Sequence, residues 1–140
     1  GGARILQPAL GRAGGIWEVK KIAAIAEVVT AQLAPHLYAG PVEWAANVQL
    51  GASIPNLLMV ETIETGGAFH QKLIGNSIQW QDGYVIVPDK PGLGIDFDED
   101  VARAHPYTGD RLHLEMQEAP PDYARPNLFE GGAPATMQPK

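Results

Sequence analysis

The amino-acid sequence predicts an α/β fold built on a parallel sheet. Residues 4–61 alternate apolar stretches of strand length with stretches that have the three- and four-residue apolar spacing of a helix. The order is strand, helix, strand, helix, strand, and helical crossovers of this kind favour parallel pairing. The last stretch, residues 57–60, is apolar at every position, which is typical of a strand buried on both faces. A closed β/α barrel and an open doubly wound sheet both fit these observations.

The first strand is expected over residues 4–9, where Pro8 should end the pairing because proline cannot donate to a sheet ladder. The glycine-rich residues 11–15 are expected to form a flexible connection. A helix should follow over about residues 16–29, because apolar residues form one stripe along it. The members of this stripe are Ile16, Val19, Ile22, Ala23, Ala26 and Val29. A second short strand is expected over residues 31–35.

A second helix is expected over about residues 41–53, with Pro41 in its first turn, where the N–H that proline lacks would have no helical partner. Residues 69–74 have the pattern of one or two further helical turns. Asp82-Gly83 lies between two apolar stretches and predicts a β-hairpin, because both residues tolerate the positive φ of a tight turn. A short helix is expected near residues 101–104, directly after acidic residues that suit its positive end.

Composition excludes several classes of function. The chain has 140 residues, of which 45% are hydrophobic, so one domain with a buried core is expected. It has no cysteine, which excludes disulfides, thiolate metal sites and a cysteine nucleophile. The formal net charge is −6 and no basic cluster occurs, so no nucleic-acid partner is expected. With no signal-peptide pattern and no apolar stretch of membrane-spanning length, we expect a cytoplasmic chain without a membrane partner.

Sites in parallel α/β folds lie at the carboxyl ends of the strands. Three residues lie at such ends in the predicted fold: Ala9, His36 and Glu61. A histidine and a glutamate at the ends of neighbouring strands can act as a proton-transfer pair. The alternative is that His36 is a structural hydrogen-bonding residue and Glu61 is the first solvated residue after an apolar strand. The other three histidines have no spacing that indicates a metal site.

Several short motifs occur in a fixed order along residues 4–107. They are Gln7-Pro8 with Arg12-Ala13-Gly14-Gly15-Ile16, Ala34-Pro35-His36, Gly40-Pro41, Ile54-Pro55-Asn56 with Glu61, Gly83-Tyr84-Val85-Ile86-Val87-Pro88 and Pro91-Gly92-Leu93-Gly94-Ile95. Each motif alone is weak, but their order and spacing together are specific. The sequence resembles the C-terminal part of an enolase-superfamily enzyme. The nearest group is the mandelate racemase/muconate lactonizing enzyme-like, acid-sugar dehydratase branch.

The resemblance implies a more detailed fold: the C-terminal strands and helices of a modified TIM barrel, plus a segment that returns to an α+β capping domain. Residues 1–76 would hold the last three barrel strands, residues 77–117 the returning segment, and residues 118–140 an extended or disordered tail. A barrel alone takes roughly 250 residues, so the chain resembles the C-terminal third of such an enzyme. The expected partners are the missing N-terminal part of the same enzyme, or a second chain, and further copies in a homo-oligomer.

The resemblance also implies a Mg²⁺-dependent enzyme that abstracts the proton α to a carboxylate, most simply a dehydratase of an acid sugar. Isomerisation, cycloisomerisation, racemisation and a non-catalytic module that keeps the fold are the alternatives. His36 would be the general base or acid at the α-carbon, and Glu61 would hydrogen-bond the substrate carboxylate and support the developing oxyanion. Tyr38 and Trp44 would shape the substrate pocket, unless they serve ordinary packing. The metal ligands are expected on upstream strands, with none in this chain.

One departure from the family pattern lies at position 9. Where the family usually has a Gln-Pro-Asp stretch whose aspartate holds the histidine, this chain has Gln7-Pro8-Ala9. Without that carboxylate, His36 loses its usual orienting partner. Either another group orients His36 or its role differs from the racemase pattern. A reaction with a single proton abstraction is easier to accommodate than a two-base racemisation.

Overall fold

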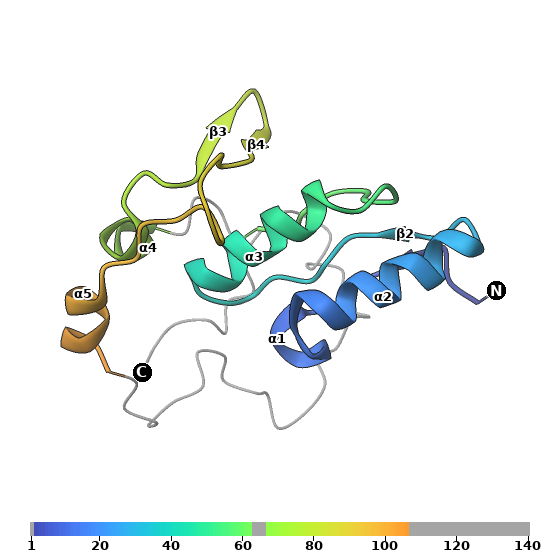
Figure 1. Cartoon of the computed structure of the whole chain (residues 1–140), viewed down its shortest axis with the longest axis horizontal. Helices are drawn as coiled ribbons and strands as arrows, with labels where there is room; N and C mark the ends of the chain where they lie inside the picture. Colours follow the sequence, from blue (N-terminus) through green and yellow to red (C-terminus); the bar gives the residue numbers. More distant parts are fainter. Residues whose placement is uncertain (1, 63–66, 107–140) are drawn as a thin grey trace, which may run out of the picture. The chain divides into compact units, whose positions relative to one another are not determined.

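The computed structural model describes residues 2–62 and 67–106 (Figure 1). Its elements, in chain order, are β1 (Ile5–Leu6), α1 (Leu10–Ala13), α2 (Gly15–Val28), β2 (Gln32–Leu33), α3 (Pro41–Ala52), α4 (Gly67–Ile74), β3 (Gln79–Gln81), β4 (Tyr84–Ile86) and α5 (Glu99–Ala104). The predicted tail, residues 118–140, lies outside the described residues. No helix within these ranges is long and apolar enough to cross a membrane.

The parallel sheet predicted from the alternation of elements is confirmed. β1 pairs with β2 in parallel, with Ile5 opposite Gln32 and Leu6 opposite Leu33. Leu33 also forms a parallel bridge to Leu57, so the predicted third strand is reduced to a single bridge. The pairings are short because prolines flank them, and a proline has no N–H to donate to a ladder.

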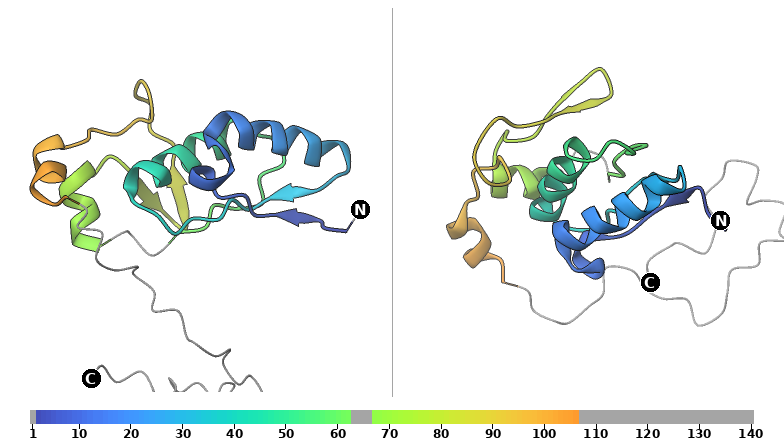
Figure 2. Two further views of the ribbon diagram at one scale, coloured as in Figure 1. Left: turned by 90° about the horizontal axis from the view of Figure 1, so that it is seen from below. Right: turned by 45° about the vertical axis from the view of Figure 1, so that its right-hand side comes forward.

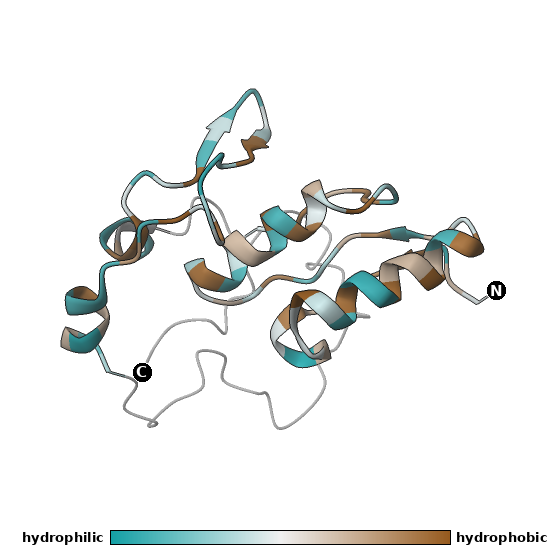
Figure 3. Ribbon diagram, viewed as in Figure 1, coloured by the Kyte–Doolittle hydropathy of each residue, from teal (hydrophilic) through white to brown (hydrophobic). Residues whose placement is uncertain are grey.

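Helix α2 covers the paired strands. In the left view of Figure 2, α2 and α3 lie on one side of β1 and β2. Figure 3 shows apolar residues recurring along α2 between polar ones. The main core consists of buried residues from α1, α2, β2, α3 and their connections, with Leu6 of β1 packed against them: Leu10, Val19, Ala23, Ala26, Ala31, Leu33, Leu50 and Ile54. The predicted stripe of α2 is thus confirmed at its centre and wrong at its ends, because Ile16 and Val29 are exposed.

The predicted flexible connection over residues 11–15 is wrong, because the chain forms helix α1 there. The buried side chain of Leu10 anchors this turn, and the carbonyl of Ala9 accepts hydrogen bonds from the N–H groups of Arg12 and Ala13. Gly14 then ends α1 with a φ of 97°, a left-handed conformation that glycine adopts without strain. The glycine therefore permits a sharp turn between two helices.

The helical turns, the hairpin and the short helix predicted for the second half of the described chain are confirmed as α4, β3–β4 and α5. In the turn between β3 and β4, Asp82 and Gly83 both have positive φ, as an Asp-Gly hairpin requires. Asp98 caps α5, because its Oδ1 accepts a hydrogen bond of 2.9 Å from the Val101 N–H. A second core cluster ties the hairpin to α3, and it contains Leu37, Trp44 and Val48 packed against Ala39, Ile78 and Val85.

Candidate active site

His36 and Glu61 meet where two neighbouring parallel segments end. His36 follows β2, and Glu61 follows the segment that bridges to β2 through Leu57. The His36 Nδ1 atom lies 2.7 Å from the Glu61 Oε2 atom, with the two side chains 40% and 43% exposed. The structure therefore brings together the two residues that the sequence placed at the ends of neighbouring strands, at a position that a small molecule can reach.

Main-chain hydrogen bonds fix both partners of this pair. The His36 N–H donates to the carbonyl of Pro8 at 3.2 Å, which ties the histidine to the end of β1. The Leu37 N–H donates to Glu61 Oε2 at 2.8 Å, so the same carboxylate oxygen binds the backbone after the histidine. The Leu37 side chain is buried in the second core cluster and anchors that donor. Sequence reasoning missed the Leu37 contact, because any residue at this position would supply the same N–H group.

The electrostatics of Glu61 follow from these contacts. The hydrogen bond from the Leu37 N–H, the largest effect, lowers the pKa of Glu61 below its ordinary value of 4.5. Partial burial opposes this change, and the contact with His36 adds to it. Glu61 is therefore ionised at neutral pH, and an ionised carboxylate can only accept hydrogen bonds.

Trp44 is a buried residue that lines a small hollow of about 90 Å³. The residue is 4% exposed and its ring lies against that of Trp80, with the ring centroids 5.7 Å apart. Burial in the second core cluster favours the alternative role for Trp44, ordinary packing, and its part in a substrate pocket stays a prediction. Tyr38 is 46% exposed and lies two residues beyond His36, so it stays a candidate for substrate contact.

The described residues do not fit a Mg²⁺ site. No group of three or more histidine, aspartate or glutamate side chains capable of holding a metal occurs in residues 2–62 and 67–106. His36 and Glu61 make only a pair, and their facing atoms already bind each other. Mg²⁺ takes octahedral oxygen ligands, and this pair offers a single carboxylate whose Oε2 atom is already bound to His36 and the Leu37 N–H.

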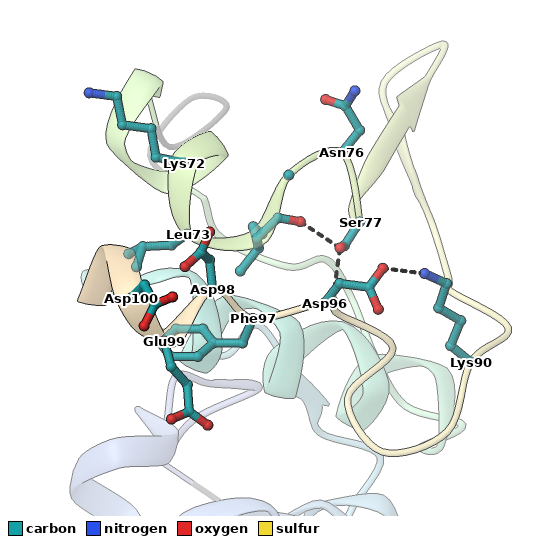
Figure 4. Close-up of a pocket in the computed structure, with 12 residues that line it drawn as sticks. Lys72, Leu73, Asn76, Ser77, Lys90, Asp96, Phe97, Asp98, Glu99 and Asp100 are labelled. Atoms are coloured by element: carbon teal, nitrogen blue, oxygen red, sulfur yellow. Dashed lines mark hydrogen bonds and ion pairs between the residues drawn. The ribbon is translucent and has the colours of Figure 1, made fainter. Parts of the chain in front are cut away.

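An open hollow of about 760 Å³ lies away from the His36–Glu61 pair, between α4 and the start of α5. Figure 4 shows Asp96 joined to Ser77 and to Lys90 by dashed lines. The Asp96 N–H donates to Ser77 Oγ at 3.0 Å, and Lys90 forms an ion pair with the Asp96 carboxylate. The polar groups that line this hollow thus hold loops together, so we assign the hollow a structural role.

Comparison with known proteins decides the family. The family model described as enolase C-terminal domain-like matches residues 1–101. The chain belongs to this family. The match places β1, β2, α2, α3 and the His36–Glu61 pair inside the enolase C-terminal domain, and it confirms the resemblance found in the sequence.

Three proteins illustrate the relationship. A D-galactonate dehydratase from Ralstonia pickettii is 34% identical over 134 residues, which cover 90% of this chain and 32% of the relative. The crystal structure of a mandelate racemase/muconate lactonizing enzyme from Sulfitobacter sp. is 68% identical with a TM-score of 0.77, covering 86% of this chain and 30% of that one. An enolase from Pantoea ananatis, solved with bound D-gluconate and Mg, is 31% identical with a TM-score of 0.68. The match covers 75% of this chain and 26% of the Pantoea ananatis chain. The enolase-family chain thus spans about a third of the length of these relatives or less.

Proposed function

We propose that this chain contributes the proton-transfer residue of an enzyme that removes the proton α to the carboxylate of an acid sugar. The most direct outcome is dehydration to a 2-keto-3-deoxy acid. The observation that carries the proposal is the His36–Glu61 pair at the ends of neighbouring parallel strands, 2.7 Å apart and open to solvent. His36 transfers the proton at the α-carbon, because a neutral imidazole is a base suited to neutral pH.

The substrate class is supported by what relatives act on or bind. The Ralstonia pickettii relative is a D-galactonate dehydratase, and the Pantoea ananatis structure holds D-gluconate and Mg. Both sugar acids carry a hydroxyl group beside an acidic α-proton, as the proposed elimination requires. We also propose that the complete enzyme binds Mg²⁺ through residues outside the described ranges, since the described residues do not fit a metal site.

The proposed domain organisation follows the same reasoning. Residues 1–76 would form the end of the barrel, and residues 77–117 would return to a capping domain. The parallel pairing of β1 with β2 supports the first assignment, and the antiparallel β3–β4 hairpin after α4 supports the second. The described chain ends at residue 106, so the rest of the second segment lies outside it.

Deuterium exchange tests the proposal. The complete protein, with Mg²⁺, is incubated in D₂O with D-galactonate or D-gluconate, and NMR follows loss of the α-proton and formation of a 2-keto acid. His36→Asn should lower the exchange rate by about 10²–10⁴-fold, the usual contribution of a general base. His105→Asn is the matched control, because His105 is an exposed histidine at the C-cap of α5.

The products separate the alternatives. Exchange without a 2-keto acid indicates an isomerase, cycloisomerase or racemase of the same superfamily. Binding of the sugar acid with no exchange in the wild-type protein indicates a non-catalytic module. Wild-type exchange rates in the His36→Asn variant would remove His36 from the mechanism.

A further inference from the structure

We propose that Glu61 is the positioning residue of His36, and that it takes the place of the carboxylate that position 9 lacks. Its Oε2 atom holds the Nδ1 side of the imidazole and leaves the Nε2 atom to exchange the proton with substrate. This inference rests on the proposed function, and it differs from the role that the resemblance implied, in which Glu61 would hydrogen-bond the substrate carboxylate.

The first step of the argument is geometric. Glu61 Oε2 lies 2.7 Å from His36 Nδ1 and accepts a hydrogen bond of 2.8 Å from the Leu37 N–H. One oxygen therefore binds both the ring of the histidine and the peptide group that follows it. Because the Leu37 side chain is buried, the carboxylate is fixed relative to the backbone, and the ring is fixed relative to the carboxylate.

The second step concerns protons. A backbone N–H and an imidazole both stabilise the charged form of Glu61, so this carboxylate offers no hydrogen to share at neutral pH. The hydrogen of a neutral His36 ring must then lie on Nδ1, which leaves the lone pair on Nε2. An ionised Glu61 also cannot donate to a substrate carboxylate. The contacts therefore favour orientation of His36 over binding of substrate.

The third step concerns position 9. The His36 N–H donates to the carbonyl of Pro8, so the next residue, Ala9, lies beside the histidine at the end of β1. An alanine side chain has no acceptor, whereas the Glu61 carboxylate lies at hydrogen-bond distance from the His36 ring. Glu61 thus supplies the carboxylate that orients the histidine. It does so from the segment after the Leu57 bridge, whereas the family usually supplies this carboxylate at the position of Ala9.

Nitrogen NMR of the protein labelled with ¹⁵N-histidine tests the inference without turnover. In the wild-type protein, His36 should carry its hydrogen on Nδ1, with Nε2 unprotonated. Glu61→Leu should let the hydrogen move to Nε2, because a leucine side chain leaves the Nδ1 N–H without an acceptor. Glu43→Leu is the matched control, because Glu43 also accepts a hydrogen bond from a backbone N–H, that of Gly11 at 3.0 Å. The control should leave the His36 tautomer unchanged.

Kinetics and rescue complete the test. Glu61→Leu should lower kcat by about 10²–10⁴-fold, as loss of a histidine's orienting carboxylate does elsewhere, with little change in KM. Adding Ala9→Asp to this variant should restore part of kcat and the Nδ1-protonated tautomer. An unchanged tautomer in Glu61→Leu would overturn the positioning role, as would a rise in KM alone. Normal exchange in His36→Asn would instead overturn the proposed function and leave the tautomer result standing.

Discussion

The Glu61 carboxylate and the His36 imidazole meet at 2.7 Å, although 25 residues separate them in the chain. Their contact joins the end of β2 to the segment after the Leu57 bridge, so it forms only when the parallel pairing has formed. The chemistry of the site and the register of the sheet are therefore coupled. A substitution that disrupts the parallel pairing should therefore also break the His36–Glu61 contact, and loss of the contact should weaken the pairing.

Acid should break this pair. The pKa of Glu61 is lowered in the folded protein, so its contribution to stability is fully present above its unfolded value of about 4.5 and is lost as the pH falls through the lower folded value. The difference in free energy of unfolding between the wild-type protein and Glu61→Gln should shrink below this pH. A ¹³C NMR titration of the Glu61 carboxyl group checks the cause, and a midpoint at or above 4.5 would contradict it.

A carboxylate at position 9 should stabilise the chain. Ala9 precedes α1 as its N-cap, with an extended backbone (φ −88°, ψ 125°) and no side-chain hydrogen bond to the helix. Ala9→Asp should raise the free energy of unfolding by about 0.5–2 kcal/mol, because aspartate accepts from the free N–H groups of a first turn. Ala9→Asn is the control that caps without charge. Chemical denaturation measures both variants, and a loss of stability in both would refute the capping argument.

Strand ends and helix periodicity were sufficient to predict the parallel sheet, α2, α3 and the proximity of His36 to Glu61. The short helix α1 was not predicted, because glycines at positions 11, 14 and 15 are equally typical of a flexible connection and of an ordered turn. Burial of Leu10 decides between these, and burial depends on elements far along the chain. Local composition alone cannot reveal that difference.

Two features of the site were beyond sequence reasoning for different physical reasons. The Leu37 N–H that binds Glu61 is a main-chain group, and no side-chain pattern identifies it. The burial of Trp44 depends on Trp80, which reaches it from the β3–β4 hairpin. Spacing from His36 suggested a substrate contact, but the hairpin covers the ring.

Trp44 should matter for stability and not for substrate binding. Its Nε1 atom is buried without a hydrogen-bond partner among the described residues, so Trp44→Phe removes an unsatisfied N–H and keeps an aromatic ring. The change in free energy of unfolding should stay within about 1.5 kcal/mol, while Trp44→Ala should cost about 3–5 kcal/mol. KM for the sugar acid should be unchanged in Trp44→Phe. A selective rise in KM would return Trp44 to the substrate site.

The turn before α5 offers a matched pair of glycines. Gly92 and Gly94 both have positive φ, at 69° and 76°. A Cβ on Gly94 would lie 2.5 Å from the Pro88 Cβ, whereas one on Gly92 would meet nothing within 4 Å in the described part of the chain. Both substitutions to alanine should lower the free energy of unfolding by about 1–2 kcal/mol because of the left-handed backbone. Only Gly94→Ala also forces the chain away from Pro88. Denaturation should therefore show Gly94→Ala to be the more destabilised variant, by about 1–3 kcal/mol; equal losses would mean that the turn relaxes freely around Pro88.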